Sequence, residues 1–544
     1  MIVNIHYYMS FKNPITYLSS TRKLSDTCVK DLELRQMYED LLKEKSETAV
    51  REMWIKNYTT DSDFLKETQQ LIAFSNKFPV KNTESFEKLW KKYTDNVGFR
   101  ETYEYITFER FYYLNNYEPI LQAISMYTLV SPALSLISPI LMLLIPFFII
   151  RFKGSSITLS KYIEVLKQVM SKIPIGQIFN ISGASWDQRI FMIFSIVFYG
   201  FQMYQNSVTC YKFYRNSKEM YTTLQTFSEF GRETINQMSN FEKVIRENNL
   251  NTYNRFVEDF SNHRLKLEDM CSKFEHVNSS SFSQLGLKMK YFYEVYCHKE
   301  LHETLNYAIH FHEYVRNLNT FSKMIEIHLN PCKFSSKKLS FKKQFYAPLR
   351  EKNPQPVKND YKISKNGIIS GPNASGKTTQ LKSTLFNLII SQQIGMGFYE
   401  SAYIIPQHHF HCYINIPDTN DRDSLFQAEA RKCKDILDML DKYPKENHFC
   451  VFDELFSGTN PYEAVASASA YLDFLHKNSN IKYMLTTHYI DLCKNMDKKC
   501  ATNYTMADNY CLKPGISTIK GGIKVLEQQK FPIEIIEKAK KLVS

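Results

Sequence analysis

A phosphate-binding loop is the clearest chemical signal in this sequence. The run that carries it is Gly371-Pro372-Asn373-Ala374-Ser375-Gly376-Lys377-Thr378, which matches the pattern G-x-x-x-x-G-K-[ST] at every fixed position. The glycines of such a loop let backbone N–H groups close around phosphates, and the start of the next helix adds positive dipole. We expect Lys377 to reach the β- and γ-phosphates of a nucleotide and Thr378 to hold Mg²⁺.

The segments on either side of this loop fit the same chemistry. A strand-like run at 361–370 leads into the loop, and a helix-compatible segment at 380–392 follows it, with Leu381, Leu385 and Leu388 on one face. Strand, glycine loop and helix, in this order, are the structural context that the motif requires. The alternative is a chance glycine turn before a helix.

Two further predicted strands end in residues that suit the same reaction. An apolar run at 449–452 is followed by Asp453 and Glu454, and the run 481–486 leads to His488. Parallel strands place such carboxyl-terminal residues at the edge of the sheet where nucleotides bind. We expect Asp453 to hold Mg²⁺ through water, Glu454 to polarise the attacking water, and His488 to contact the γ-phosphate or orient that water. The alternatives are a helix-capping acidic pair and a structural histidine.

The composition is basic, and the cysteines do not follow a metal-binding or disulfide pattern. The net charge of +12 over 544 residues favours a polyanionic partner, either nucleic acid or an acidic membrane face. The 11 cysteines form no C-x-x-C pair, so neither a zinc knuckle nor a disulfide framework is indicated. The N-terminus lacks the charged start and cleavage site of a signal peptide. The basic stretch 333–343 is interpreted as a solvated linker, with phosphate contact as the alternative.

Periodicity and composition divide the chain into four regions. Residues 1–115 are charged and mainly helical in pattern, and residues 116–211 contain long apolar runs. Residues 212–340 belong to a stretch without proline, 175–330, in which apolar residues recur every three or four positions, as in long helices. Residues 341–544 hold the loop and its strands. The predicted fold class is α + α/β, with helical N-terminal and middle regions followed by an α/β domain.

The apolar region leaves two interpretations open. Residues 119–150 and 190–211 carry no charge, and each run is long enough to cross a bilayer. Three prolines and three amides weaken this interpretation: Pro132, Pro139, Pro146, Gln202, Gln205 and Asn206. The basic residues between the two runs would also lie away from the predicted nucleotide domain, against the positive-inside tendency. A buried helical core is the alternative. We expect an intracellular protein, with soluble and membrane-associated states both open.

Several motifs together resemble the ATPase domain of the MutS mismatch-repair family. They are the loop at 371–378, the run Asp453-Glu454-Leu455-Phe456-Ser457-Gly458-Thr459, and Thr486-Thr487-His488-Tyr489. The segment 424–429 is similar to the serine-containing helix start of that family. The segments 521–523 and 531–539 are similar to its closing glycine segment and C-terminal dimerisation helices. The likeness covers about residues 345–544.

This resemblance implies an ABC-type P-loop ATPase that uses ATP and Mg²⁺ and works as a homodimer with composite sites. It implies metal binding by Thr378 and Asp453, catalysis by Glu454, His488 and Lys377, and contact of Ser424 with the γ-phosphate of the partner subunit. The implied nucleotide-binding residues are Gly371, Pro372, Asn373, Ala374, Ser375, Gly376, Lys377, Thr378, Thr379 and Ser424. The implied function is an ATP-dependent, DNA-binding conformational switch in repair or recombination.

The resemblance stops short of mismatch recognition. Repair proteins of this family begin with a domain that wedges a phenylalanine into DNA beside a glutamate, and residues 1–115 contain no convincing copy. The letters Gly-Phe-Tyr-Glu do occur at 397–400, but inside the predicted ATPase domain, so the match is interpreted as coincidence. The apolar runs instead resemble shorter MutS-related proteins. A membrane-attached ATPase without mismatch recognition is therefore the alternative function.

Overall fold

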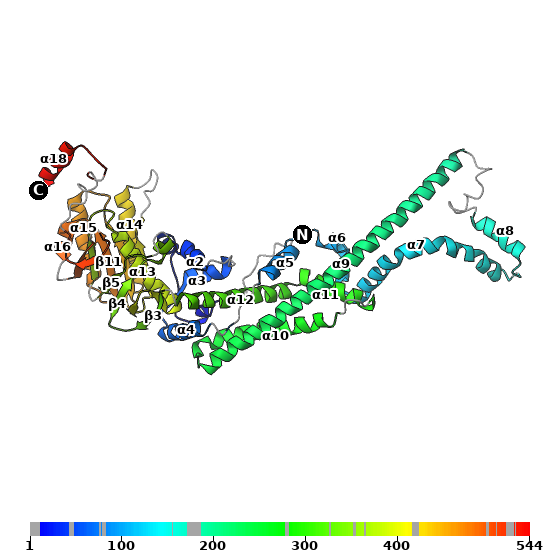
Figure 1. The fold of residues 1–544 in the computed structure, drawn as a ribbon, viewed down its shortest axis with the longest axis horizontal. Helices are drawn as coiled ribbons and strands as arrows, with labels where there is room; N and C mark the ends of the chain where they lie inside the picture. The colour runs from blue at the N-terminus through cyan, green and yellow to red at the C-terminus, as the bar shows by residue number, and fades with distance from the viewer. Residues whose placement is uncertain are drawn as a thin grey trace. The chain divides into compact units, whose positions relative to one another are not determined.

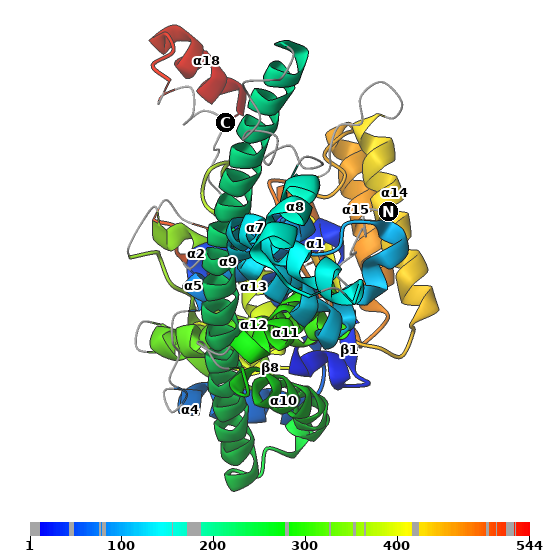
Figure 2. The same cartoon turned by 90° about the vertical axis from the view of Figure 1, so that its right-hand side faces the viewer.

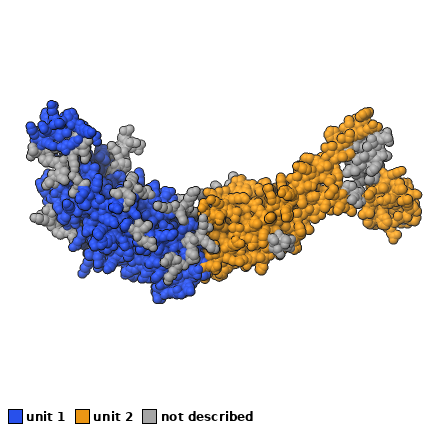
Figure 3. Space-filling view, viewed as in Figure 1, with its two compact units in different colours: residues 1–81, 237–262, 309–544 blue, residues 82–236, 263–308 orange. Residues whose placement is uncertain are grey.

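The structure is a computed structural model, and two compact units make up its described part (Figure 1, Figure 3). Unit 1 contains residues 1–81, 237–262 and 309–544, and unit 2 contains residues 82–236 and 263–308. The residues described are 11–42, 48–75, 78, 83–154, 156–170, 186–277, 282–325, 328–351, 355–363, 366–415, 424–496, 500–506, 509–517, 527 and 529–543.

Unit 2 is built from helices. Its members are α5 (Glu84–Thr94), α6 (Phe99–Thr102), η3 (Glu109–Asn116), α7 (Glu118–Phe152), α8 (Leu159–Met170), η6 (Phe282–Gln284) and α11 (Leu285–Cys297). Helices α9 (Trp186–Glu247), α10 (Asn254–Glu275) and α12 (Lys299–Ile325) contribute residues to both units. Helix α9 is a single uninterrupted helix (Figure 1, Figure 2). The core of unit 2 is aromatic, with Phe86 stacked on Phe230 and Phe99 on Tyr296. Long helices were expected from the proline-free stretch, and they are confirmed.

A six-stranded sheet forms the centre of unit 1. Its strand order is β13-β12-β6-β11-β10-β9, with β6 (Asn366–Ser370), β9 (His409–Tyr413), β10 (His448–Asp453), β11 (Ile481–Thr487), β12 (Ala501–Met506) and β13 (Leu512–Pro514). All neighbours are parallel except β12 and β13. The packing helices are α13 (Lys377–Ile394), α14 (Leu425–Lys442), α15 (Pro461–His476) and α16 (Ile490–Met496), and α18 (Ile533–Val543) follows. Mixed helix and sheet was the predicted fold class, and this is confirmed.

A second sheet corrects two sequence expectations. Its order is β5-β4-β8-β3-β7, with β3 (Leu329–Phe334), β4 (Leu339–Gln344), β5 (Asn359–Ile363), β7 (Met396–Phe398) and β8 (Ser401–Ile404). The stretch 333–343 is therefore largely strand and not a linker, because Leu339 and Phe341 alternate inward between exposed lysines. The single strand expected at 361–370 is two strands, β5 and β6, in different sheets.

The N-terminal segment of unit 1 packs around the end of helix α13. It contains η1 (Pro14–Tyr17), β1 (Thr21–Lys23), α1 (Asp26–Asp31), α2 (Leu34–Leu42), α3 (Thr48–Lys56), β2 (Asn57–Thr59) and α4 (Ser62–Phe74), and unit 1 also holds η5 (Asn251–Tyr253) and η7 (Ala347–Glu351). Gln393 donates to the carbonyls of Trp54 and Ile55 and accepts from Tyr38. Gly395 ends the helix at φ +74°, and a Cβ there would lie 2.5 Å from the Leu65 carbonyl oxygen. Only glycine fits this close approach.

A pair of buried histidines joins the edge strand β9 to its neighbour β10. His448 Nε2 donates to the Tyr443 carbonyl at 3.0 Å, so its Nδ1 accepts from His411 Nε2 at 3.0 Å when both rings are neutral. Burial lowers the pKa of His411 to about 3 and also lowers the pKa of His448. The folded chain therefore favours the uncharged pair.

This pair predicts a loss of stability in mild acid. A histidine of the unfolded chain titrates near pH 6.5. Because the folded pKa of His411 is lower, its contribution is complete above about pH 6.5 and is lost progressively as the pH falls toward 3. We expect a loss of about 2 kcal/mol between pH 7 and pH 5. His411→Gln should reduce the fall in melting temperature over this range, whereas the same change at exposed His476 should not. An unchanged fall in His411→Gln would contradict the prediction.

Candidate active site

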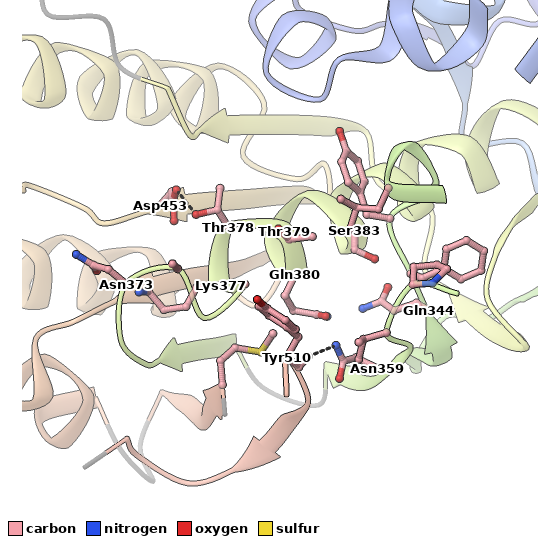
Figure 4. Close-up of a pocket in the computed structure, with 18 of the residues that line it drawn as sticks. Gln344, Asn359, Asn373, Lys377, Thr378, Thr379, Gln380, Ser383, Asp453 and Tyr510 are labelled. Atoms are coloured by element: carbon pink, nitrogen blue, oxygen red, sulfur yellow. Dashed lines mark hydrogen bonds between the residues drawn. The ribbon is translucent and has the colours of Figure 1, made fainter. Parts of the chain in front are cut away.

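The glycine loop lies between strand β6 and helix α13, as the sequence predicts (Figure 4). Every residue of β6 is buried, so the strand fixes the position where the loop begins. Ala374 and Gly376 take positive φ angles of 61° and 93°, which turn successive backbone N–H groups toward one side. The side-chain oxygen of Ser375 is buried and has no hydrogen-bond partner within the described residues. A loop of this form can surround an anion.

Lys377 is buried at the first position of α13. Its Nζ donates to the carbonyls of Gly371 and Pro372, both at 3.0 Å, and lies 3.7 Å from a Glu454 oxygen. Burial lowers the pKa of this ammonium group, and the nearby carboxylates oppose that shift. The Lys377 ammonium group lies beside the loop, where a phosphate could replace the two carbonyls as its partner.

Asp453 joins three elements through one carboxylate. It ends strand β10, accepts from Thr378 Oγ1 of α13 at 2.8 Å, and accepts from the Thr486 hydroxyl of β11. Burial raises the pKa of Asp453, and the two hydroxyl donors counteract this effect. A threonine hydroxyl beside a carboxylate supplies the hard oxygen ligands that Mg²⁺ prefers.

Glu454 has a left-handed backbone conformation, which is unusual for a residue other than glycine. Its φ is +53°, and its N–H donates to the Thr486 carbonyl at 3.1 Å. One carboxylate oxygen lies 3.6 Å from His488 Nδ1 and 3.7 Å from Lys377 Nζ. Interaction with His488 is the main cause that lowers the pKa of Glu454. The carboxylate is therefore kept ionised, as a group that accepts a proton or orients water must be.

These residues meet at a cavity of about 600 Å³ (Figure 4). Figure 4 shows Asp453 and Thr378 toward one end and Gln344 and Asn359 toward the other. Of the residues expected from the sequence, those that line the cavity are Asn373, Ala374, Gly376, Lys377, Thr378, Thr379, Asp453 and Glu454. Gly371, Pro372 and Ser375 belong to the loop itself, and His488 lies outside the lining with its Nδ1 3.6 Å from a Glu454 oxygen, so its contact with a γ-phosphate or with the attacking water stays a prediction.

Ser424 is not part of this cavity. It caps helix α14, where its Oγ accepts from the N–H of Gln427 at 3.3 Å while the Gln427 side chain accepts from the Ser424 N–H. Its side chain is exposed. Contact between Ser424 and a nucleotide on a partner subunit stays a prediction.

The far end of the cavity was not foreseen from the sequence. Its walls are apolar and aromatic with a few amides, and they come from segments far apart in the chain. They include Gln344, Phe345, Tyr346, Leu349, Pro356, Val357, Asn359, Met506 and Tyr510. Asn359 is fixed on both sides, because it donates to the Tyr510 carbonyl at 3.0 Å and accepts from the Leu512 N–H at 2.8 Å. No local motif marks these residues, because they come from both sheets and from the segments between strands, and only the tertiary structure brings them together.

Glu429 was also missed, and it holds the loop that follows Glu454. Its buried carboxylate accepts from the N–H and hydroxyl of Ser457, at 3.0 and 2.9 Å, and from the N–H of Gly458 at 3.1 Å. Gly458 also lies tightly against helix α14, since a Cβ there would be 2.7 Å from the Phe426 nitrogen. Helix α14, which begins at Ser424, is thereby tied to the strand end that carries Glu454.

Removing this carboxylate should destabilise unit 1. Glu429→Ala would leave buried N–H groups without an acceptor, and we expect a loss of about 3 kcal/mol. The amide protons of Ser457 and Gly458 should also exchange faster with solvent. Glu463→Ala is the matched control, because Glu463 accepts a single exposed bond from Thr459. Equal melting temperatures for the two variants would rule out the role given to Glu429.

Comparison with known proteins agrees with this geometry. Residues 367–544 match the profile of MutS domain V. The chain is 29% identical over 192 residues to the DNA mismatch repair protein MutS of Staphylococcus epidermidis and 27% identical over 212 residues to Endonuclease MutS2 of Fusobacterium nucleatum. These alignments cover 32% and 35% of this chain but only 21% and 24% of the relatives. The chain thus matches about a quarter or less of their length.

Proposed function

Because this chain belongs to the MutS family through its domain V at 367–544, we propose that it binds and hydrolyses Mg·ATP at the cavity around Lys377. One observation carries the proposal. The loop amides, Lys377, Thr378, Asp453 and Glu454 border a single cavity large enough for a nucleotide. Fold and loop support an ABC-type ATPase domain, in which these groups position the triphosphate and neutralise its charge.

The residues present fit both ATP and Mg²⁺. The hydroxyl of Thr378 and the carboxylate of Asp453, 2.8 Å apart, would hold the metal, and the unpartnered Ser375 hydroxyl lies in the phosphate loop. The apolar and aromatic end of the cavity suits a nucleobase. Bound Mg²⁺ would supply positive charge to the phosphate oxygens.

The protein groups then have separate tasks. Lys377 exchanges its two loop carbonyls for phosphate oxygens and so neutralises the charge that develops on them. Glu454, kept ionised beside His488, orients the attacking water and accepts its proton. His488 holds the Glu454 carboxylate in that position.

We further propose that the chain acts as a homodimer on DNA, in repair or recombination. The relatives described above are named as a DNA mismatch repair protein and as a MutS2 endonuclease, and these names support this role. The net charge of +12 favours a polyanion. Helix α14 links Ser424, proposed to face the partner's nucleotide, to the loop after Glu454 through Glu429, so binding in one subunit could alter the other.

Two substitutions separate nucleotide binding from hydrolysis. Lys377→Ala should weaken ATP binding at least about tenfold, because the phosphates lose their buried cation. Glu454→Gln should keep ATP bound while kcat falls by about 10²–10⁴, as for loss of a general base. Lys382→Ala is the control, since Lys382 lies on the same helix and pairs with Glu33. Calorimetry and phosphate release provide the measurements. ATP binding by Lys377→Ala at the affinity of the unaltered protein would refute the proposed site.

Two measurements test the DNA role: the dependence of DNA affinity on salt concentration, and the dependence of ATP turnover on the form of DNA that is added. Phosphate contacts release counterions, so the DNA affinity should fall steeply and linearly with salt concentration on a double-logarithmic plot. ATP turnover is measured with homoduplex, mismatched and branched DNA, with Glu454→Gln to subtract background. A turnover rate that none of the three changes, together with absent binding at low salt, would contradict a DNA-dependent ATPase and leave the nucleotide site standing.

A further inference from the structure

Two helices of unit 2 carry a large apolar surface that the fold leaves uncovered. We define the apolar arm as residues 128–150 of α7 and 190–211 of α9. Its exposed side chains include Leu144 and Phe148 on α7, at 50% and 56% exposure, and Phe194 and Phe198 on α9, at 69% and 68%. Within the described residues, Glu118–Ile137 of α7 is the one candidate membrane span by length and composition, and only 11% of its most apolar window is buried. A core helix of a soluble protein would be mostly buried.

A set of polar side chains in the arm lies at the contact between α7 and α9, while Gln202, Gln205, Ser207 and Thr209 of α9 are exposed. Thr128, Ser131 and Ser135 recur at three- and four-residue steps, so they form one stripe on α7. Asn206 of α9 donates to the Ser135 hydroxyl at 2.7 Å, and the Tyr199 hydroxyl of α9 donates to the Ser135 carbonyl. The two helices therefore meet around Ser135, and many of their apolar side chains lie exposed.

Four hydroxyl groups of the arm donate to backbone carbonyls of their own helix and so have partners without water. Thr128 donates to the Ile124 carbonyl, Ser131 to Thr128, and Ser135 to Ser131, at 2.9 to 3.0 Å. Ser195 on α9 donates to Phe191 in the same way, at 2.9 Å. Internal satisfaction of polar groups is what a hydrocarbon solvent demands, and small hydroxyl residues commonly line contacts between membrane helices.

The apolar faces are too wide for a single protein contact. On α9, exposed Phe191, Phe194 and Ile196 point in directions that span about 200° around the helix axis, since successive residues differ by about 100°. A second copy or a partner helix covers one stripe. A bilayer surrounds the helix and covers every direction except the stripe that faces α7.

The arm has the length of a bilayer and polar ends. Before it, α7 is packed into unit 2, where Gln122 bonds Gly286 and Phe282, and Ser125 is buried beside Met289. At 1.5 Å per residue the two apolar stretches are about 34 and 33 Å long, against about 30 Å for the hydrocarbon core. The connection 151–189 carries six basic and two acidic residues. Lys212, Arg215 and Lys218 follow the stretch in α9, so basic residues that suit anionic headgroups flank both ends of the apolar stretches in the sequence.

We propose that the apolar arm is a two-helix hairpin that spans a lipid bilayer and anchors the chain to it. The polar stripes of α7 and α9 hold the hairpin together, and the outward apolar faces contact lipid. The proposal does not depend on the proposed ATPase activity. It extends that function by giving the nucleotide domain a membrane location.

Vesicle flotation tests the anchor. The full chain, purified in mild detergent, is reconstituted into vesicles of phosphatidylcholine and phosphatidylglycerol and centrifuged through a density gradient. We expect the protein to float and to remain bound through high salt and alkaline carbonate. Trp186, at the end of the arm, is exposed, whereas Trp54 and Trp90 are buried. Brominated lipids should therefore quench mainly Trp186, and Trp186→Phe should remove this quenching.

Charge substitution supplies the matched comparison. Phe194→Arg with Val197→Arg places two cations on the lipid-facing side and should reduce recovery with vesicles at least about tenfold. Leu265→Arg alters an equally exposed apolar position of α10 outside the arm and should float normally. Circular dichroism and the melting temperature verify folding of each variant. Release by high salt would indicate a peripheral electrostatic contact, and a discrete oligomer that stays in the dense fraction would indicate a second copy as the occupant. Either result overturns the proposal.

Discussion

One carboxylate links the elements on which the candidate site depends. Asp453 accepts hydrogen bonds from Thr378 at the start of α13 and from Thr486 at the end of β11, while its own backbone ends β10. The glycine loop, two strand ends and the first turn of a helix are thus held at one edge of the sheet. Burial raises the pKa of Asp453, and its two hydroxyl donors stabilise the charged form that a cation site requires.

Around that point, the fold supports the site from two directions. Glu429 binds the loop after Glu454 from helix α14. At the other end of α13, Gln392 and Gln393 bond the backbone of residues 54–59, and Gly395 admits the Leu65 carbonyl. Helix α13 is therefore fixed at both ends. Asp453 contacts its first turn, and the N-terminal segment contacts its last turn.

The two units differ in where they place polar and apolar side chains. In unit 1 the sheet buries β6 and encloses charged side chains at its edge, where each has partners. In unit 2, Ser135 and Asn206 of the apolar arm meet at the helix contact, while many of its leucines and phenylalanines are exposed. Both arrangements satisfy hydrogen bonds, but they suit different surroundings: water for the first and hydrocarbon for the second.

The sequence by itself determined the loop, the strand ends at Asp453 and His488, and the long helices, because each depends on residues close together in the chain. In a strand–loop–helix unit, the order Gly376-Lys377-Thr378 places the lysine and threonine at the start of the helix that follows the loop. Only the tertiary structure showed that 333–343 forms strands, that Glu429 holds the loop after Glu454, and that Gln344, Asn359 and Tyr510 share a cavity with the loop. Likewise, only the tertiary structure showed that Asn206 of the second uncharged run donates to Ser135 of the first. These features depend on which distant segments meet, and pairing across such distances leaves no period or spacing in the chain to read.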